Sequence, residues 1–279
     1  METSGPPSDL SLNTAVVRTL LEKFLLDETH NAGFTRGIIG LSGGVDSALT
    51  AFLAAGALGR ENVRAVMMPY RTSSSESLSD ARRVIDVLGI VPETVDITPI
   101  VDPALSSLGA GDRVRGGNIM ARARMIVLYD ISAREGGLVL GTSNKTEILL
   151  GYGTLFGDMA SAINPLGDLY KTQVWQLAAA VGVPREIVDK KPTADLWSGQ
   201  TDEGELGFSY RDVDRLLFAM IDERRSPAEL ASAGFDERFV RSVQAIVKKS
   251  QFNRRPPVVA KVSHRTVNVD FRYARDWGI

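Results

Sequence analysis

Short apolar runs alternate with longer amphipathic stretches over the first half of the chain. The short runs predict four strands, over residues 36–41, 63–68, 93–97 and 137–140. The amphipathic stretches predict helices over residues 12–29, 45–58, 77–88 and 118–135. Strands and helices that alternate at these lengths favour an α/β fold with a doubly wound parallel sheet, in which ligands bind at the carboxyl ends of the strands.

The pattern changes after residue 148. Residues 151–168 are glycine-rich and irregular, residues 171–181 predict a helix, and residues 192–209 form a long polar segment. Further helices are expected over residues 211–223, 227–233 and 237–250. We therefore predict a single domain, 1–279, with an α/β core (12–150), a region of loops and capping helices (151–251), and a basic C-terminal tail (252–279).

Composition narrows the class of protein. With 279 residues, of which 44% are hydrophobic, the chain can bury a large core. The sequence has no cysteine and only two histidines, which excludes disulfides and sulfur nucleophiles and argues against a histidine-rich metal site. The N-terminus is polar and no apolar stretch has the length of a membrane span, so we expect a cytoplasmic protein without a membrane partner.

Charge is balanced overall but uneven along the chain. The formal net charge of −2 gives no reason to expect a nucleic-acid partner. From Arg238 onward, however, lysine and arginine outnumber the acids. A solvated basic face, a contact with a phosphorylated substrate and a contact with a second subunit all remain open as explanations.

The junction between the first strand and the following helix carries the most informative motif, Ser42-Gly43-Gly44-Val45-Asp46-Ser47. A helix N-terminus offers unpaired N–H groups and positive potential, two glycines let the backbone approach a phosphate, and Ser42 and Ser47 add hydroxyl donors. The loop lacks the lysine of a Walker P-loop. Asp46 inside such an anion site implies Mg²⁺ carried with a nucleotide, because a bare carboxylate would repel phosphate. A ligand-free turn is the plain alternative.

A second polar loop, residues 141–147, follows the strand at 137–140. Because the carboxyl ends of parallel strands share one edge of the sheet, we expect the nucleotide to lie between the two loops. Lys171 opens a predicted helix, where a lysine opposes the helix dipole, and an anionic partner would explain that position.

Five ordered segments carry a family resemblance: LSGGVDS, GGNIMARARM, LVLGTSNKTE, NPLGDLYKT and KPTADLWSGQTDEGELGFSY. The first resembles the loop of the ATP pyrophosphatase (PP-loop) families. Together they make residues 12–251 similar to NAD synthetase of the ammonia-dependent type. This resemblance implies an adenine nucleotide alpha hydrolase-like fold and ATP-dependent amidation of deamido-NAD by ammonia, through an adenylate, with release of AMP and pyrophosphate.

The resemblance also implies roles for individual residues. Asp46 and Glu147 would bind Mg²⁺, Asp46 and Lys171 would be catalytic, and Arg122 would bind deamido-NAD. The implied ATP-binding residues are Gly40, Leu41, Ser42, Gly43, Gly44, Val45, Asp46, Ser47, Thr142, Lys171 and Thr193. Residues 198–207, with three acids and three glycines, are expected to be mobile without ligand and to close over ATP.

Some positions depart from the family pattern. Leu155 and Ala162 stand where many relatives have a lysine and an aspartate that hold deamido-NAD, and Phe252 and Asn253 replace a histidine-lysine pair. Residues 151–159 are closer to glutamine-dependent relatives.

These departures leave several alternatives open. The chain lacks a cysteine to activate glutamine, so we expect it to use free ammonia or ammonia from a separate glutaminase subunit. A PP-loop ligase with another acceptor, or a nucleotide-binding subunit without turnover, are further alternatives. Family members are usually homodimers, and the resemblance implies a homodimer here.

Overall fold

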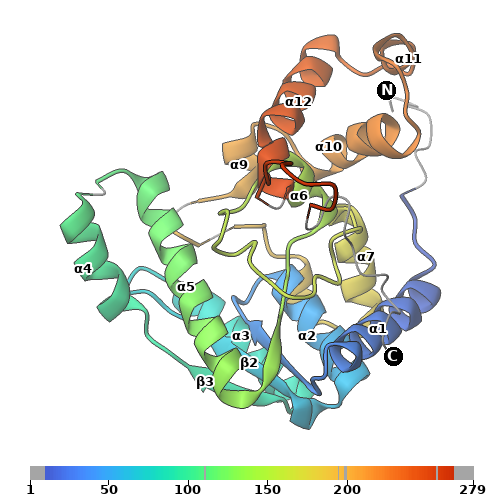
Figure 1. The fold of residues 1–279 in the computed structure, drawn as a ribbon. Coiled ribbons are helices and arrows are strands. Elements are labelled where there is room, and N and C mark those ends of the chain that lie inside the picture. The colour runs from blue at the N-terminus through green and yellow to red at the C-terminus, as the bar shows by residue number, and fades with distance from the viewer. Residues whose placement is uncertain (1–9, 110, 194, 198–199, 256, 267–279) are drawn as a thin grey trace.

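A computed structural model describes residues 10–109, 111–193, 195–197, 200–255 and 257–266 of the chain. Its centre is a four-stranded parallel sheet in the order β3-β2-β1-β4 (Figure 1). The strands are β1 Arg36–Gly40, β2 Val63–Met67, β3 Val91–Thr94 and β4 Gly137–Leu140. A parallel bridge between Leu140 and Ile163 lengthens the sheet beside β4. The predicted parallel α/β fold is confirmed.

Alternate strand residues supply two separate hydrophobic cores, because successive side chains of a strand point to opposite faces. Ile39, Ala65 and Met67 pack in the core beneath α1 (Thr14–Asn31), α2 (Val45–Leu58), α3 (Ser75–Leu88) and α7 (Lys171–Val181). Ile38 and Val66 pack on the other face, against α4 (Thr98–Leu108) and α5 (Arg113–Glu135). The sheet therefore has helices on both faces.

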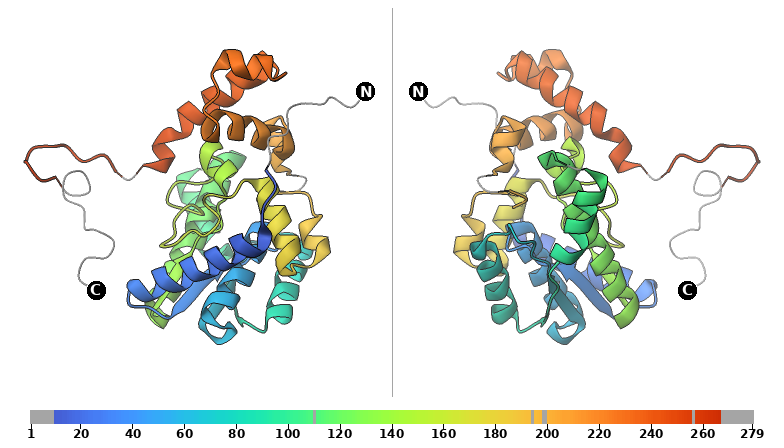
Figure 2. Two further views of the ribbon diagram at one scale, coloured as in Figure 1. Left: turned by 90° about the vertical axis from the view of Figure 1, so that its right-hand side faces the viewer. Right: turned by 90° about the vertical axis from the view of Figure 1, so that its left-hand side faces the viewer.

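The remaining elements stand above the carboxyl end of the sheet (Figures 1 and 2). They form a third hydrophobic core, in which Tyr170 of the α7 N-cap packs with Leu217 and Val243 of the cap helices. These elements are α6 Lys145–Leu150, α9 Asp202–Leu206, α10 Tyr210–Leu217, η2 Phe218–Asp222, α11 Pro227–Ser232, α12 Glu237–Lys249 and η3 Ser250–Arg254. The short elements η1 (Arg60–Asn62) and α8 (Arg185–Val188) lie outside this cap. The division into three segments stays a prediction.

Several predicted boundaries were wrong. Helix α4 and the short helices α6, α8 and α9 were not predicted, β3 begins and ends earlier than expected, and α5 begins at Arg113. These elements have polar or proline-containing sequences, which are poor signals for a helix. Pro103 lies inside α4, although Val101 of the same helix is fully buried. Packing against the sheet outweighs the local cost of a proline in that helix.

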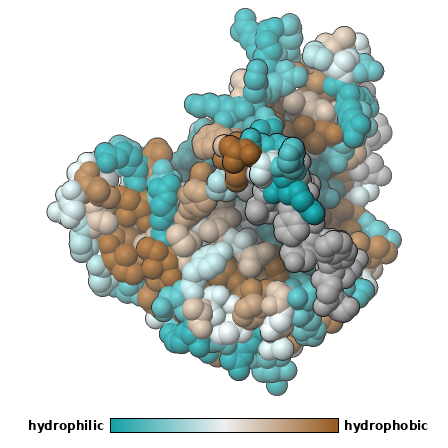
Figure 3. Space-filling view, viewed as in Figure 1, coloured by the Kyte–Doolittle hydropathy of each residue, from teal (hydrophilic) through white to brown (hydrophobic). Residues whose placement is uncertain are grey.

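The outer surface of α4 and α5 is unusually apolar. Exposed hydrophobic side chains gather there, as Figure 3 shows for this face of the molecule. They include Ile100, Leu108, Val114, Ile126 and Tyr129. Within the part of the chain that the structure describes, no helix has the length and apolar character needed to cross a membrane.

Candidate functional site

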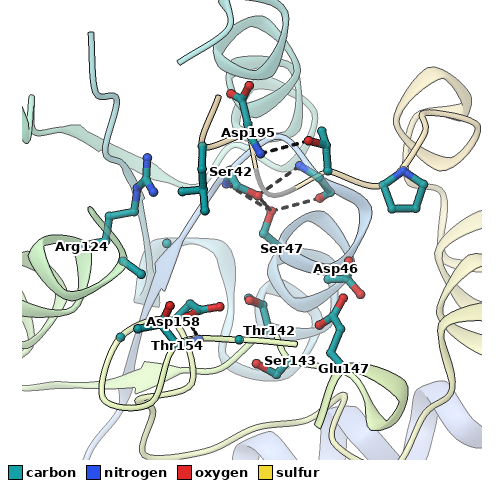
Figure 4. Close-up of a pocket in the computed structure, with 18 of the residues that line it drawn as sticks. Ser42, Asp46, Ser47, Arg124, Thr142, Ser143, Glu147, Thr154, Asp158 and Asp195 are labelled. Carbon is teal, nitrogen blue, oxygen red and sulfur yellow. Dashed lines mark hydrogen bonds between the residues drawn. The ribbon is translucent and has the colours of Figure 1, made fainter. Parts of the chain in front are cut away.

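The glycine-rich loop forms a tight anion cradle at the start of α2. Gly43 has φ +83°, and a Cβ there would lie 2.2 Å from the carbonyl oxygen of Ser77, so a side chain is excluded. The two serine hydroxyls bond within the loop (Figure 4). Ser47 Oγ donates to Gly44 O at 3.0 Å, and Ser42 Oγ accepts from Gly44 N at 3.2 Å. These bonds fix the backbone that faces the cavity.

Asp46, Glu147 and Lys171 meet beside this loop. Lys171 Nζ lies 2.6 Å from Asp46 Oδ2 and 3.2 Å from Glu147 Oε1. The lysine side chain is only 2% exposed, whereas those of Asp46 and Glu147 are 17% and 15% exposed. Figure 4 shows the two carboxylates pointing toward one another. Sequence segments that are distant along the chain thus converge as predicted, with the lysine bridging both acids.

Burial and charge act in opposite directions on this group. Burial raises the pKa of Glu147 above its ordinary value, although the charge of Lys171 opposes this rise. Burial alone would lower the pKa of Lys171, but the charges of Asp46 and Glu147 raise it above its ordinary value. The ammonium group is therefore held in its charged form between two acids.

Asn144 connects the two strand ends. Its Oδ1 accepts from Glu147 N at 3.0 Å and Glu147 Oε2 accepts from Asn144 N at 3.3 Å, which makes a capping box at the start of α6. Its Nδ2 donates to Asp46 Oδ1 at 2.9 Å. The residue is fully buried, and it orients both acids, Asp46 through its side-chain amide and the Glu147 carboxylate through its backbone N–H.

The two carboxylates match the oxygen ligands that Mg²⁺ prefers. Among the described residues, no three His, Cys, Asp or Glu side chains converge as a complete metal site. An ion here would take the remaining ligands from phosphate oxygens and water, which fits a metal that arrives with a nucleotide.

A cavity of about 450 Å³ opens over this group. Every predicted ATP-side and metal residue lines it, including Thr142 and Thr193. Arg122 does not line it: this side chain is exposed on α5 and its Nη2 donates to Leu155 O at 3.2 Å. The departing positions Leu155, Ala162 and Phe252 also lie outside the lining.

Arg124, two residues further along α5, lines the cavity instead. Its Nε donates to Met68 O at 3.2 Å. Burial lowers the pKa of Arg124, while the negative charges of Asp195 and Asp158 oppose that change. Two positions along an α-helix correspond to a rotation of about 200°, so Arg122 and Arg124 lie on nearly opposite sides of α5. Only one of them can therefore face the sheet and its loops.

The second half of the chain adds a polar wall that the sequence did not single out. Tyr152 Oη lies 3.0 Å from Asp202 Oδ1 and 2.9 Å from Glu205 Oε2. Tyr210 Oη donates to the other oxygen of Asp202 at 3.2 Å. Its two acids, Asp202 and Glu205, belong to the segment 198–207 that we expected to close over ATP, whereas the two tyrosines were not predicted; Ser198 and Gly199 lie outside the described residues.

A parallel sheet with a glycine-rich anion loop after β1, and a lysine and two acids at its edge, defines a nucleotide-binding protein of the PP-loop class. The chain belongs to the NAD synthase family, whose model matches residues 17–257.

Relatives and solved structures agree with this assignment. The chain is 59% identical to an NH(3)-dependent NAD(+) synthetase of Trichlorobacter lovleyi, over 97% of this chain and 99% of that protein. It is 54% identical to one of Chlorobium phaeobacteroides strain BS1, over 96% and 97% of the two chains. A structure of the NH3-dependent NAD synthetase of Campylobacter jejuni has a TM-score of 0.78 at 31% identity, covering 90% of this chain and 100% of that one. The structure of an NMN synthetase of Francisella tularensis has a TM-score of 0.80 at 31% identity, with the same coverage.

Proposed function

We propose that this protein amidates deamido-NAD to NAD with ATP and ammonia. The observation that carries the proposal is the convergence of Asp46, Glu147 and Lys171 beside the anion loop, in a chain of the NAD synthase family. A nucleotide-binding subunit without turnover would have no need of a buried lysine shared by two acids at the mouth of that loop.

The nicotinate carboxylate of deamido-NAD attacks the α-phosphate of ATP and pyrophosphate leaves. Ammonia then attacks the mixed anhydride and AMP departs, because adenylate is a far better leaving group than a carboxylate oxygen. Lys171 and the N–H groups at the start of α2 stabilise the charge that develops at phosphorus. Mg²⁺, held by Asp46 and Glu147, would offset the charge of the leaving pyrophosphate.

The apolar end of the cavity suits the adenine base. A Cβ on Gly40 would lie 3.1 Å from Met68 Cε and 3.3 Å from Leu128 Cδ1, so the two apolar side chains pack close to the backbone at Gly40. All three residues line the cavity together with Thr142 and Thr193. In this proposal the nucleotide extends from the apolar end of the cavity to the anion loop, with its phosphates near Lys171.

One assay tests the proposal directly. The purified protein is incubated with ATP, Mg²⁺, ammonium and deamido-NAD, and AMP and NAD are quantified together. Equal amounts of the two products support the proposal. AMP without NAD, or neither product, would contradict it.

The acceptor has one specific alternative, the corresponding mononucleotide. The Francisella protein with a TM-score of 0.80 is named as an NMN synthetase, and it shares this fold at 31% identity. The same assay with nicotinate mononucleotide in place of deamido-NAD separates the two acceptors by their kcat/KM.

The nitrogen donor is proposed to be free ammonia. The chain has no cysteine, so it lacks the usual nucleophile that releases ammonia from glutamine. A match to the glutamine-dependent NAD+ synthetase of Acinetobacter baumannii covers 94% of this chain but 49% of that one. Supply of ammonia by a separate glutaminase subunit is the alternative, and adding such a subunit to the assay tests it.

The oligomer is proposed to be a homodimer that works in the cytoplasm, where ATP and pyridine nucleotides are available. The exposed apolar side chains of α4 and α5, such as Ile126 and Tyr129, support a contact with a second copy. Arg122, on the exposed side of α5, would then act on deamido-NAD from the subunit boundary. Sedimentation of the protein gives its mass in solution, and a monomer at every concentration would contradict the dimer.

A further inference from the structure

A fully buried acid of the cap touches both helices that carry the catalytic group. Asp214 of α10 has no exposed surface. Its Oδ1 accepts from Thr146 Oγ1 at 2.6 Å and its Oδ2 accepts from Thr172 N at 2.8 Å. Thr146 Oγ1 in turn accepts from Lys171 N at 3.0 Å. The threonine precedes Glu147 on α6, so a single carboxylate joins the starts of α6 and α7.

A second acid of the cap repeats this arrangement. Asp222, the last residue of η2, accepts hydrogen bonds from Tyr170 Oη and, at 2.9 Å, from Lys145 Nζ. Lys145 Nζ also lies 4.7 Å from the centre of the Tyr170 ring. Each cap aspartate therefore binds one residue of α6 and one residue at the start of α7.

The π-helical form of η2 lets the two acids reach the starts of the same two helices, α6 and α7. In a continuous α-helix, residues eight apart differ by about 80° in direction. Phe218–Asp222 is wider, and Glu223 N donates to Phe218 O at 3.1 Å, five residues back. More residues per turn reduce the offset and bring Asp222 close to the face that carries Asp214. Single π-helical turns of this kind are frequent at functional sites.

We propose that Asp214 and Asp222 form a two-point clamp that positions Glu147 and Lys171 for ATP and its metal. The residues that the clamp holds flank this pair directly: Lys145 and Thr146 precede Glu147, and Tyr170 and Thr172 enclose Lys171. The cap helices thus set the distance between the metal-binding acid and the lysine. This inference rests on the proposed function, since it assigns the clamp's effect to Mg²⁺-ATP.

The alternative is a clamp that merely ties the cap to the core. The two explanations differ in how Mg²⁺ changes the affinity for ATP. Loss of a purely structural tie lowers ATP affinity with and without Mg²⁺ in proportion. A displaced Glu147 lowers the affinity measured with Mg²⁺ far more than that measured with EDTA, because Glu147 binds the ion and not the base or ribose.

The test uses isothermal titration of the full chain with ATP, in Mg²⁺ and in EDTA. Thr146→Val keeps the shape of the side chain but removes both hydrogen bonds, whereas Thr146→Ser retains them. Asp212→Asn on the same helix is the control, because Asp212 is exposed and bonds only to Ser209 within its own turn. Mutation of a residue that orients a metal ligand without touching the metal typically costs about 10- to 100-fold in metal affinity. We therefore expect Thr146→Val to reduce the Mg²⁺-dependent gain in affinity by about 10- to 100-fold.

The serine variant and the Asp212 variant should keep the wild-type gain. A Thr146→Val protein with native circular dichroism and an unchanged ratio of the two affinities would overturn the clamp. If Thr146→Val does not fold, Tyr170→Phe decides alone, since it removes only the hydroxyl that bonds to Asp222. Failure of the proposed function looks different: the wild type would bind Mg²⁺-ATP but make no NAD.

Discussion

Replacing Lys171 by methionine isolates the electrostatic role of the lysine, because the side chain keeps an unbranched apolar stem only one atom shorter and loses its charge. In the wild type, the ammonium group lies 2.6 Å from Asp46 Oδ2 and 3.2 Å from Glu147 Oε1. The variant leaves two carboxylates side by side without a cation. We expect it to be less stable than the wild type and to respond to Mg²⁺ in the absence of nucleotide.

The expected magnitude follows from burial. Removing one partner of a buried ion pair typically costs about 3–5 kcal/mol. Asp46 and Glu147 retain 17% and 15% of their side-chain exposure, so water reaches them and the lower end of this range applies. A loss of about 3 kcal/mol corresponds to a decrease in Tm of roughly 6 to 12 °C for a protein of this size. Free Mg²⁺ at about ten times its dissociation constant would restore about 1.4 kcal/mol.

Thermal unfolding with and without MgCl₂ measures both effects. Burial raises the pKa of Glu147 to about 8 even beside Lys171, and loss of that cation raises it further, so the scans start at about pH 8 and go upward; the destabilisation and the Mg²⁺ response should both grow as Glu147 loses its proton. Lys23→Met is the matched control, because it removes a lysine that pairs with Asp27 on the exposed surface of α1. Two results would refute the reasoning. One is a Lys171→Met protein with the Tm of the wild type, and the other is a Lys171→Met protein whose Tm MgCl₂ does not raise.

Three further outcomes are expected. Asp46→Asn should reduce kcat at limiting Mg²⁺ at least about 100-fold with an unchanged circular dichroism spectrum, and retention of a tenth of the activity would contradict the metal role. Glutamine alone should not support NAD formation by the protein verified free of other subunits, which steady-state assays with each donor decide. Although burial raises the pKa of Glu135, hydrogen bonds from Arg64 and Arg134 lower it below its ordinary value. The stabilisation from Glu135 is therefore complete above the unfolded pKa of about 4.3 and is lost as the pH falls through the folded value, so Glu135→Gln should flatten the acid side of a Tm-against-pH curve.

Elements with clear boundaries in the sequence could be predicted closely. Helix α2 was predicted from Val45 to Leu58, and it begins after Gly44 and ends before Gly59, which adopts φ +84°. Helix α7 likewise ends before Gly182. Glycine at the end of a helix is a local signal, so it is readable without knowledge of the tertiary structure.

Elements that depend on distant contacts could not be predicted in the same way. Pro103 lies within α4, and that helix is held by packing of Val101 and Leu105 in the core between α5 and the sheet. The five residues of α9 include a glycine and three acids, so their sequence does not predict a helix. Its Asp202 accepts hydrogen bonds from tyrosine hydroxyls outside the helix. Local propensity is too weak to decide such cases.

The catalytic group was identified by motif, but its supporting residues were not. Asp214 had a readable signal, because it is an acid within the apolar stripe of α10, beside Val213 and Leu217. Nothing in the sequence indicates that its partners are Thr146 and Thr172, since these lie 68 and 42 residues away. A buried acid on a helix predicts a partner without telling which one.

The amide of Asn144 restricts which residues are tolerated at that position. Asparagine, aspartate and serine begin helices about equally well, so capping of α6 alone would allow any of them. Only asparagine among these three also has an N–H₂ group to donate to Asp46 from the opposite side of the same side chain. Hydrolysis of this amide to an acid, as in an ageing protein, would preserve the helix and place a negative charge against Asp46. Such a molecule would keep its fold and lose the arrangement of its acids, so a sample could age into an inactive protein that still looks native by circular dichroism.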